Sequence, residues 1–215
     1  MKINVQNVSK SFKNEAVLNN INISFNDGKI YGLIGRNGSG KSVFLKILCG
    51  FYVPDCGFVK YNDIDIFKDN VYPPSTRALI EKPTFLSDLS GYENLKILAS
   101  LNNIIGEKEI NDALDKVDLL DEKDKKYHKY SLGMKQKLGI AQAIMENPDV
   151  LILDEPFNGL DEKSTKKIRK VLLEEKKKGK IIILASHIRD DIELLADEVY
   201  KMDAGSLKKV NKNDN

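Results

Sequence analysis

One stretch, residues 35–42 (Gly-Arg-Asn-Gly-Ser-Gly-Lys-Ser), constrains the fold of this chain more than any other. It has the spacing G-x-x-x-x-G-K-[ST] of a phosphate-binding loop. The sequence predicts a buried strand before it, over residues 29–34, and a helix after it, over residues 43–48. Glycines between a strand and a helix let backbone N–H groups point into a common hollow, and the N-terminus of the helix favours an anion. This context favours a nucleotide triphosphate site over a chance glycine-rich turn.

The roles of the loop residues follow from their chemistry. Lys41 is expected to reach the β- and γ-phosphates, where it would also stabilise transferred charge. The Ser42 hydroxyl is expected to take one ligand position on Mg²⁺. The residues expected to bind the nucleotide are Gly35, Asn37, Gly38, Ser39, Gly40, Lys41 and Ser42.

Two carboxylates follow a second apolar stretch. Residues 149–153 (Asp-Val-Leu-Ile-Leu) predict a central parallel strand, which delivers Asp154 and Glu155 to the edge where open α/β sheets bind ligands. Asp154 is expected to hold Mg²⁺, usually through a water, and Glu155 to polarise the attacking water as a general base. An apolar run that ends in Asp-Glu is common by itself, so this assignment depends on the phosphate-binding loop.

Composition limits the partners and the location of the chain. Its 34 basic and 32 acidic residues leave a formal charge of +2, which disfavours nucleic-acid binding through a broad basic face. No apolar run approaches the roughly 20 residues of a membrane span, and residues 1–4 do not begin a signal peptide. We therefore expect a cytosolic protein, in which Cys49 and Cys56 form neither a disulfide nor a metal site.

The order of the elements predicts the α/β class: a P-loop NTPase core with a parallel central sheet, an N-terminal antiparallel β subdomain and an inserted helical subdomain. Residues 1–81 and 148–215 are expected to form the nucleotide-binding core with the β subdomain, and residues 82–147 the helical subdomain. The remaining expected strands cover residues 3–5, 21–25, 58–61, 77–81, 181–185, 199–202 and 207–210, and the expected helices cover residues 91–98, 110–120, 162–178 and 190–196.

Residues 130–136 (Tyr-Ser-Leu-Gly-Met-Lys-Gln) open a further predicted helix ahead of the Asp-Glu strand. Here the sequence resembles the ATP-binding cassette (ABC) ATPases, whose signature is L-S-G-G-Q. Ser131 and Gly133 match this signature, whereas Leu132 and Met134 depart from it. The resemblance implies that this segment caps the γ-phosphate held by a second subunit, with the Ser131 hydroxyl and a helix N-terminus. Without the other motifs, Ser131 is equally explained as an ordinary helix N-cap.

Three further segments match the same family. Residues 158–161 (Asn-Gly-Leu-Asp) match its D-loop, which crosses the dimer interface. His187 follows the predicted strand 181–185 at the place of the family's switch histidine, which contacts the γ-phosphate. Phe12 falls where the family stacks adenine, although its local sequence alone equally suits a core residue.

Glu81 is a departure from the family, which usually has Gln at the passage into the helical insert. A glutamate can also ligate Mg²⁺, and more strongly than an amide, because it brings a charge. Residues 79–83 (Leu-Ile-Glu-Lys-Pro) and 130–136 resemble the bacterial ABC transporter ATPases of the bacitracin and lantibiotic resistance type.

The resemblance implies a pair of cassettes, expected to be a homodimer, that encloses two ATP–Mg²⁺ and hydrolyses ATP with Lys41, Glu155 and His187. It also implies separate permease subunits, which would hold the chain at the cytoplasmic face of the cell membrane. Export of peptide antibiotics or similar compounds is the transport it suggests.

Other function classes stay open at this point. A soluble ABC ATPase acting on nucleic acid or the ribosome would co-purify with nucleic acid rather than with a permease. A nucleotide-gated binding module would bind ATP without hydrolysing it in a single turnover. A GTPase is disfavoured, because the D-x-x-G over residues 88–91 and the N-K-x-D over residues 211–214 lack the neighbouring strands and helix that those motifs need.

Overall fold

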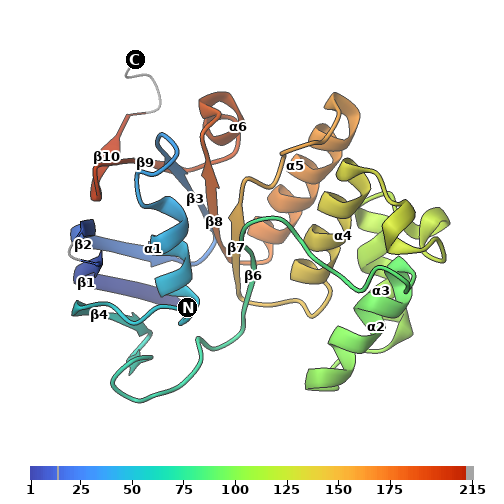
Figure 1. Ribbon diagram of the computed structural model, residues 1–215, viewed down its shortest axis with the longest axis horizontal. Helices are drawn as coiled ribbons and strands as arrows, with labels where there is room; N and C mark the ends of the chain where they lie inside the picture. The colour runs from blue at the N-terminus through green and yellow to red at the C-terminus, as the bar shows by residue number, and fades with distance from the viewer. Residues whose placement is uncertain (14, 212–215) are drawn as a thin grey trace.

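The computed structural model describes residues 1–13 and 15–211, and a six-stranded sheet forms the centre of this part of the chain (Figure 1). Its strands are β3 (Lys29–Ile34), β6 (Thr76–Leu79), β7 (Val150–Asp154), β8 (Ile181–Ser186), β9 (Glu198–Asp203) and β10 (Ser206–Val210). They lie in the order β10-β9-β3-β8-β7-β6, and all neighbours are parallel except β10, which pairs antiparallel with β9. The carboxyl ends of the parallel strands therefore meet at one edge.

A second, antiparallel sheet confirms the predicted β subdomain. Its strands are β1 (Lys2–Phe12), β2 (Glu15–Asn26), β4 (Cys56–Tyr61) and β5 (Ile64–Asp65), in the order β2-β1-β4-β5. Phe12 is the last residue of β1 and pairs with Glu15, so it ends a strand rather than lying in a connecting loop.

The central strands bury both of their faces. In β7, Val150 and Ile152 pack on the side of the antiparallel sheet, whereas Leu151 and Leu153 pack on the opposite side. This alternation follows from the two-residue period of a strand, and it explains why β7 is apolar throughout. Helix α1 (Lys41–Leu48) fills the space between the two sheets (Figure 1).

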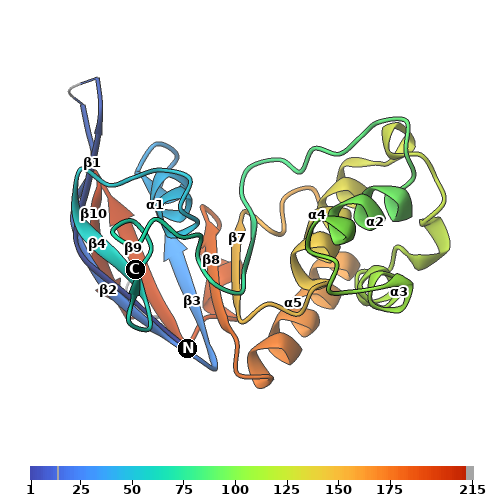
Figure 2. The same cartoon turned by 90° about the horizontal axis from the view of Figure 1, so that it is seen from below.

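Helices cover the other face of the central sheet. They are α2 (Gly91–Asn102), α3 (Glu107–Lys116), α4 (Leu132–Ile144), α5 (Glu162–Lys177) and α6 (Arg189–Glu193), with short 3₁₀ turns at Leu120–Glu122 and Tyr127–Lys129. Figure 2 shows α2, α3 and α4 gathered at the end of the molecule opposite the antiparallel sheet. These three helices all fall within the segment predicted to be a helical insert. The observed α/β architecture is the predicted one.

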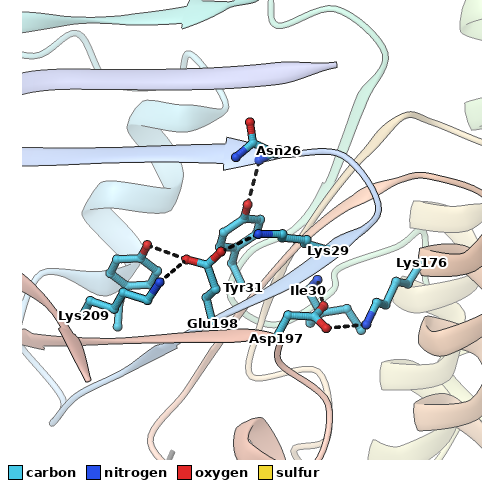
Figure 3. Close-up of polar contacts among 9 residues, drawn as sticks. Asn26, Lys29, Ile30, Tyr31, Lys176, Asp197, Glu198 and Lys209 are labelled. Atoms are coloured by element: carbon cyan, nitrogen blue, oxygen red, sulfur yellow. Dashed lines mark hydrogen bonds and ion pairs between the residues drawn. The ribbon is translucent and has the colours of Figure 1, made fainter. Parts of the chain in front are cut away.

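A group of ion pairs fixes the edge formed by β3, β9 and β10 (Figure 3). The Glu198 carboxylate accepts from Lys29 Nζ of β3 and from Lys209 Nζ of β10, each at 2.8 Å. The neighbouring Asp197 pairs with Lys176, at the end of α5. One short acidic segment therefore connects three strands and a helix.

Several predicted boundaries were wrong by a few residues. Strand β6 ends at Leu79, because Glu81 has a φ of +64° that no strand accommodates. Helix α3 ends before Asp118, which has a φ of +53°. Helix α6 is also shorter than predicted.

The described residues also bear on three smaller expectations. Cys49 and Cys56 are free, as predicted. Within the described ranges 1–13 and 15–211, no helix is both long enough and apolar enough to cross a bilayer. The N-K-x-D stretch of residues 211–214 extends beyond the described residues.

Candidate nucleotide-binding site

The predicted phosphate-binding loop connects β3 to α1, as its spacing requires. Helix α1 begins at Lys41, directly after Gly40, whose φ of +107° favours glycine. A Cβ at Gly40 would also lie 2.9 Å from both Leu18 Cδ2 and Val17 O. Backbone conformation and close packing against β2 therefore both require glycine at this position.

Ser42 and Asp154 meet at the carboxyl edge of the central sheet. The Ser42 hydroxyl, in the first turn of α1, donates to Asp154 Oδ2 at 2.7 Å, at the end of β7. Burial raises the pKa of Asp154 above its usual range, and the hydrogen bond from Ser42 opposes this shift. The positive charge of Lys41 also lowers the pKa of Asp154, but it does not outweigh burial. The pair therefore offers a hydroxyl and a carboxylate oxygen to a cation.

Lys41 is buried and makes its contacts with the loop itself. Its ammonium donates to the backbone oxygens of Gly35, at 2.6 Å, and Arg36, at 3.3 Å. Ser39 Oγ is buried beside this loop without a hydrogen-bond partner in the described part of the chain. Buried polar atoms are nearly always paired, so an unpartnered hydroxyl here indicates a place for a polar ligand.

Glu155 follows Asp154 and turns towards the end of β8. Its backbone has a φ of +49°, which is uncommon for a residue with a side chain. Its Oε2 accepts from Ser186 Oγ at 3.0 Å, and its Oε1 accepts from the backbone N–H of His187 at 2.9 Å. His187 Nδ1 also lies 2.8 Å from Oε1. The predicted base and the predicted switch histidine are therefore direct partners.

A cavity of about 400 Å³ lies where these groups meet. It is lined by Val17, Asn37, Gly38, Ser39, Gly40, Lys41, Ser42, Val43, Asp154 and Glu155. Residues 37–42 of the phosphate loop and both carboxylates therefore surround one space, whereas the predicted site residues Gly35 and His187 are not among its lining residues. Its volume suits a bound small molecule.

Phe12 lies outside this lining and is half-exposed, at 39%. The edge of the Tyr52 ring packs on it, with 5.4 Å between ring centroids. Lys10 Nζ lies 5.3 Å from the centroid of the Phe12 ring. Phe12 is thus an accessible aromatic ring rather than a core residue, as stacking on a base requires.

Ser131 and Gly133 lie at the start of α4, and neither lines the cavity among the described residues. Ser131 is the N-cap of α4 and accepts from the backbone N–H of Met134 at 3.2 Å. A Cβ at Gly133 would lie 3.0 Å from Gly159 O, so this segment packs closely on the segment after β7. The ordinary capping role of Ser131 is therefore present within one chain, and its side of the helix is exposed to solvent.

Glu81 lies beyond the end of β6 and is largely exposed, at 64% of its side chain. Its carboxylate pairs with Lys46 of α1. It does not line the cavity in the part of the chain that the structure describes.

Three residues outside the predicted set contact predicted site residues. Ser186 holds the Glu155 carboxylate, Gln136 Nε2 donates to Glu155 O at 3.0 Å, and Lys46 pairs with Glu81. One signal was available for Lys46, which lies one helical turn after Ser42. The contacts of Ser186 and Gln136 depend on tertiary packing alone.

Comparisons with known proteins agree with this geometry. Residues 18–158 match the family model described as ABC transporter. An uncharacterized ABC transporter ATP-binding protein of Bacillus subtilis, YybJ, is 42% identical over 96% of this chain and 94% of its own length. The bacitracin transport ATP-binding protein BcrA of Enterococcus faecalis is 41% identical over 95% of this chain and 67% of its own length.

Two other similarities complete the comparison. The lantibiotic transport ATP-binding protein SrtF of Streptococcus pyogenes is 36% identical, over 91% of this chain and 84% of its own length. A solved ATP-binding subunit of an ABC transporter superposes with a TM-score of 0.88 at 27% identity. That superposition covers 98% of this chain and 90% of the other.

Proposed function

Because the chain belongs to the ABC transporter family of ATP-binding proteins, we propose that it is the ATP-binding and ATP-hydrolysing subunit of a membrane transporter. The observation that carries the proposal is the hydrogen bond between Ser42 and Asp154 at the mouth of the phosphate-loop cavity. It joins the two motifs that an ATPase of this class needs, a phosphate cradle and a carboxylate at the strand end.

ATP is proposed to bind with its phosphates against the loop between β3 and α1. Backbone N–H groups and the N-terminus of α1 would hold the β- and γ-phosphates. Lys41 would exchange the carbonyl oxygens of Gly35 and Arg36 for phosphate oxygens. The adenine would stack on the half-exposed ring of Phe12.

The residues present fit a magnesium ion. Ser42 and Asp154 supply two oxygen atoms, and the raised pKa of Asp154 shows a carboxylate that a cation would stabilise. Among the described residues no group of three or more acidic, His or Cys side chains could hold a metal alone. Phosphate oxygens and water would complete the coordination, which is the usual arrangement for Mg²⁺. When bound, Mg²⁺ would neutralise charge on the phosphates.

Glu155 is proposed to take the proton of the water that attacks the γ-phosphate. Its carboxylate is fixed by Ser186 and His187, so it cannot turn freely. Lys41 would stabilise the charge that develops on the transferred phosphoryl group. His187, whose imidazole lies against Glu155, would contribute a further hydrogen bond at the γ-phosphate.

A second copy of the chain is proposed to complete each site. Ser131 caps α4 at the surface, outside the cavity of its own chain. The neighbouring Leu132 is also exposed, at 59%, so this end of α4 is accessible to a second subunit. In a homodimer, Ser131 and Gly133 of one subunit would cover the γ-phosphate bound by the other.

Permease subunits are the proposed membrane partners, and they would hold the chain at the cytoplasmic face. Two adjacent cavities, of about 500 and 460 Å³, lie where the core passes into the proposed helical subdomain of residues 82–147. They share Ala78, Ile80 and Gln142 as lining residues. The surface is apolar and close to Glu81, so a permease segment docked there would sense the nucleotide site. The bacitracin and lantibiotic transport relatives suggest peptide antibiotics as the transported class.

The test is phosphate release by the purified protein and by its Glu155→Gln variant. Wild-type protein is expected to release phosphate from ATP–Mg²⁺, and Glu155→Gln to lower the rate at least about 100-fold, because a general base contributes about that much. ATP affinity, measured by titration calorimetry, should stay within about threefold, since the amide preserves the shape of the side chain. Undiminished turnover in Glu155→Gln would remove this residue from the base role.

A further inference from the structure

Lys46 and Glu81 form an ion pair that has no part in the proposed reaction. Lys46 Nζ donates to Glu81 Oε1, and the lysine side chain is four-fifths buried while the glutamate is mostly exposed. The Lys46 ammonium also lies 5.5 Å from the centroid of the Tyr52 ring, whose edge packs on Phe12. The Lys46 ammonium therefore contacts both Glu81 and the aromatic ring that packs beside Phe12.

Helix geometry places this ion pair beside the metal position. Ser42 and Lys46 are four residues apart on α1, so their side chains lie next to each other on one face of the helix. Ser42 donates to Asp154, and Lys46 pairs with Glu81. Strands β6 and β7 pair in parallel with Leu79 opposite Leu153, which brings Glu81 to the same sheet edge as Asp154.

The local charges interact across this edge. Glu81 lies at the same sheet edge as Asp154 and Glu155, and Lys46 compensates its negative charge. The left-handed backbone of Glu81 is consistent with a residue held for function.

We propose that Lys46 is a positioning residue that controls how the site responds to magnesium. In the protein without nucleotide, Lys46 neutralises Glu81 and holds it against α1. On binding of a divalent cation with ATP, Glu81 exchanges Lys46 for the cation, so metal binding must compete with an internal ion pair. The inference rests on the proposed ATP–Mg²⁺ site, and it assigns a role to a residue outside the motifs.

The experiment is a double-mutant cycle of Lys46→Met and Glu81→Gln on nucleotide affinity. Titration calorimetry gives the dissociation constant of a non-hydrolysable ATP analogue in EDTA and in excess Mg²⁺, and the ratio of the two is the metal response. Lys46→Met is expected to raise this ratio by about tenfold, because a freed Glu81 attracts the cation and repels metal-free ATP. In the Glu81→Gln background the same change should be no more than about twofold, since no carboxylate remains to be released.

A matched control removes the same charge from an ion pair elsewhere. Lys166 pairs with Glu162 on α5 at 2.6 Å, and Lys166→Met is expected to leave the metal response unchanged. Equal effects of Lys46→Met in both backgrounds would overturn the proposal while leaving the nucleotide site intact. Failure of wild-type protein to bind the analogue under either condition would overturn the site itself and this inference with it.

A second measurement covers the case in which Lys46→Met does not fold. Glu81→Gln changes an exposed side chain, and alone it should lower the metal response by about threefold, because it removes a charged ligand candidate. Lys46→Arg, which keeps the ion pair, should behave like wild type. An unchanged response in Glu81→Gln would contradict the proposal.

Discussion

At the scale of single residues, the nucleotide site contains buried polar side chains that lower the stability of the fold and are available to bind a ligand. Asp154 is buried with one hydrogen bond from Ser42, and Ser39 Oγ is buried with none within the described chain. Glu155 and Glu81 both have backbone conformations that residues with side chains rarely adopt. These groups lie around the phosphate-loop end of the central sheet, where a ligand would supply the missing interactions.

Replacing Asp154 should separate stability from binding. Burial raises the pKa of Asp154 in the folded protein. Protonated Asp154 therefore stabilises the fold in full below about pH 3.8, and this stabilisation is lost as the pH rises through the raised pKa. At pH 7 the ionised form therefore weakens folding, and Asp154→Asn should stabilise the nucleotide-free protein by about 1 kcal/mol, or roughly 2–4 °C in Tm. Thermal melts check this prediction.

The same variant should lose its response to ligand. A Mg²⁺-loaded, non-hydrolysable ATP analogue is expected to raise the Tm of wild type but to raise that of Asp154→Asn much less, because the amide lacks the charge a cation prefers. If Asp154→Asn is instead less stable than wild type without nucleotide, the ionised Asp154 stabilises the fold, which would contradict this prediction.

At the scale of elements, ion pairs connect β3, β9 and β10 in addition to the apolar packing of their buried residues. Glu198 receives one ammonium from each neighbouring strand (Figure 3). The hydrogen bonds from Lys209 and Lys29 lower the pKa of Glu198 from 4.5 to about 2. Because β3 leads directly into the phosphate loop, this edge supports the strand from which the site begins.

The stability of that edge should depend on pH. Since the pKa of Glu198 is lowered in the folded state, its contribution is full above about pH 4.5 and is lost as the pH falls towards 2. We expect the free energy of unfolding to fall by about 2 kcal/mol over that range through Glu198 alone, after allowance for its partial exposure. Urea unfolding of wild type and Glu198→Gln at several pH values isolates the contribution of Glu198 to the free energy of unfolding. Parallel pH profiles for the two proteins would contradict it.

At the scale of the whole molecule, the proposed reaction needs two copies. Ser131 lies outside the phosphate cavity, and the cavity lining among the described residues contains no part of α4. Figure 2 shows α4 beside α2 and α3, across the central sheet from α1. A single chain thus presents the two halves of the proposed site separately.

Dimerisation can be tested without disturbing the helix cap. Asp and Asn are both good N-caps, so Ser131→Asp and Ser131→Asn should preserve the monomer. In a Glu155→Gln background, light scattering should show ATP-driven dimers. Ser131→Asp should abolish them by repelling the γ-phosphate, whereas Ser131→Asn should weaken them by less than about tenfold. Equal dimerisation of the Asp and Asn variants would place Ser131 outside the interface.

The local motifs could be found from the sequence because each has its own spacing and flanking pattern. Residues 35–42 predicted the turn between β3 and α1, and the apolar run before Asp154 predicted a central strand buried on both faces. Boundaries were less predictable where one residue changes the chain direction. Nothing in the local sequence indicates the positive φ of Glu81, so the predicted strand extended past the end of β6.

The sequence by itself determined the class of fold, the order of its elements and the residues at the phosphate loop, because those depend on short-range patterns of apolar and glycine residues. Only the tertiary structure decided which polar groups become partners: Ser186 with Glu155, and Lys46 with Glu81. These contacts join segments far apart in the chain, and they form because parallel strands bring their carboxyl ends to one edge. Pairing across that edge is set by packing of the whole sheet, which no local pattern encodes.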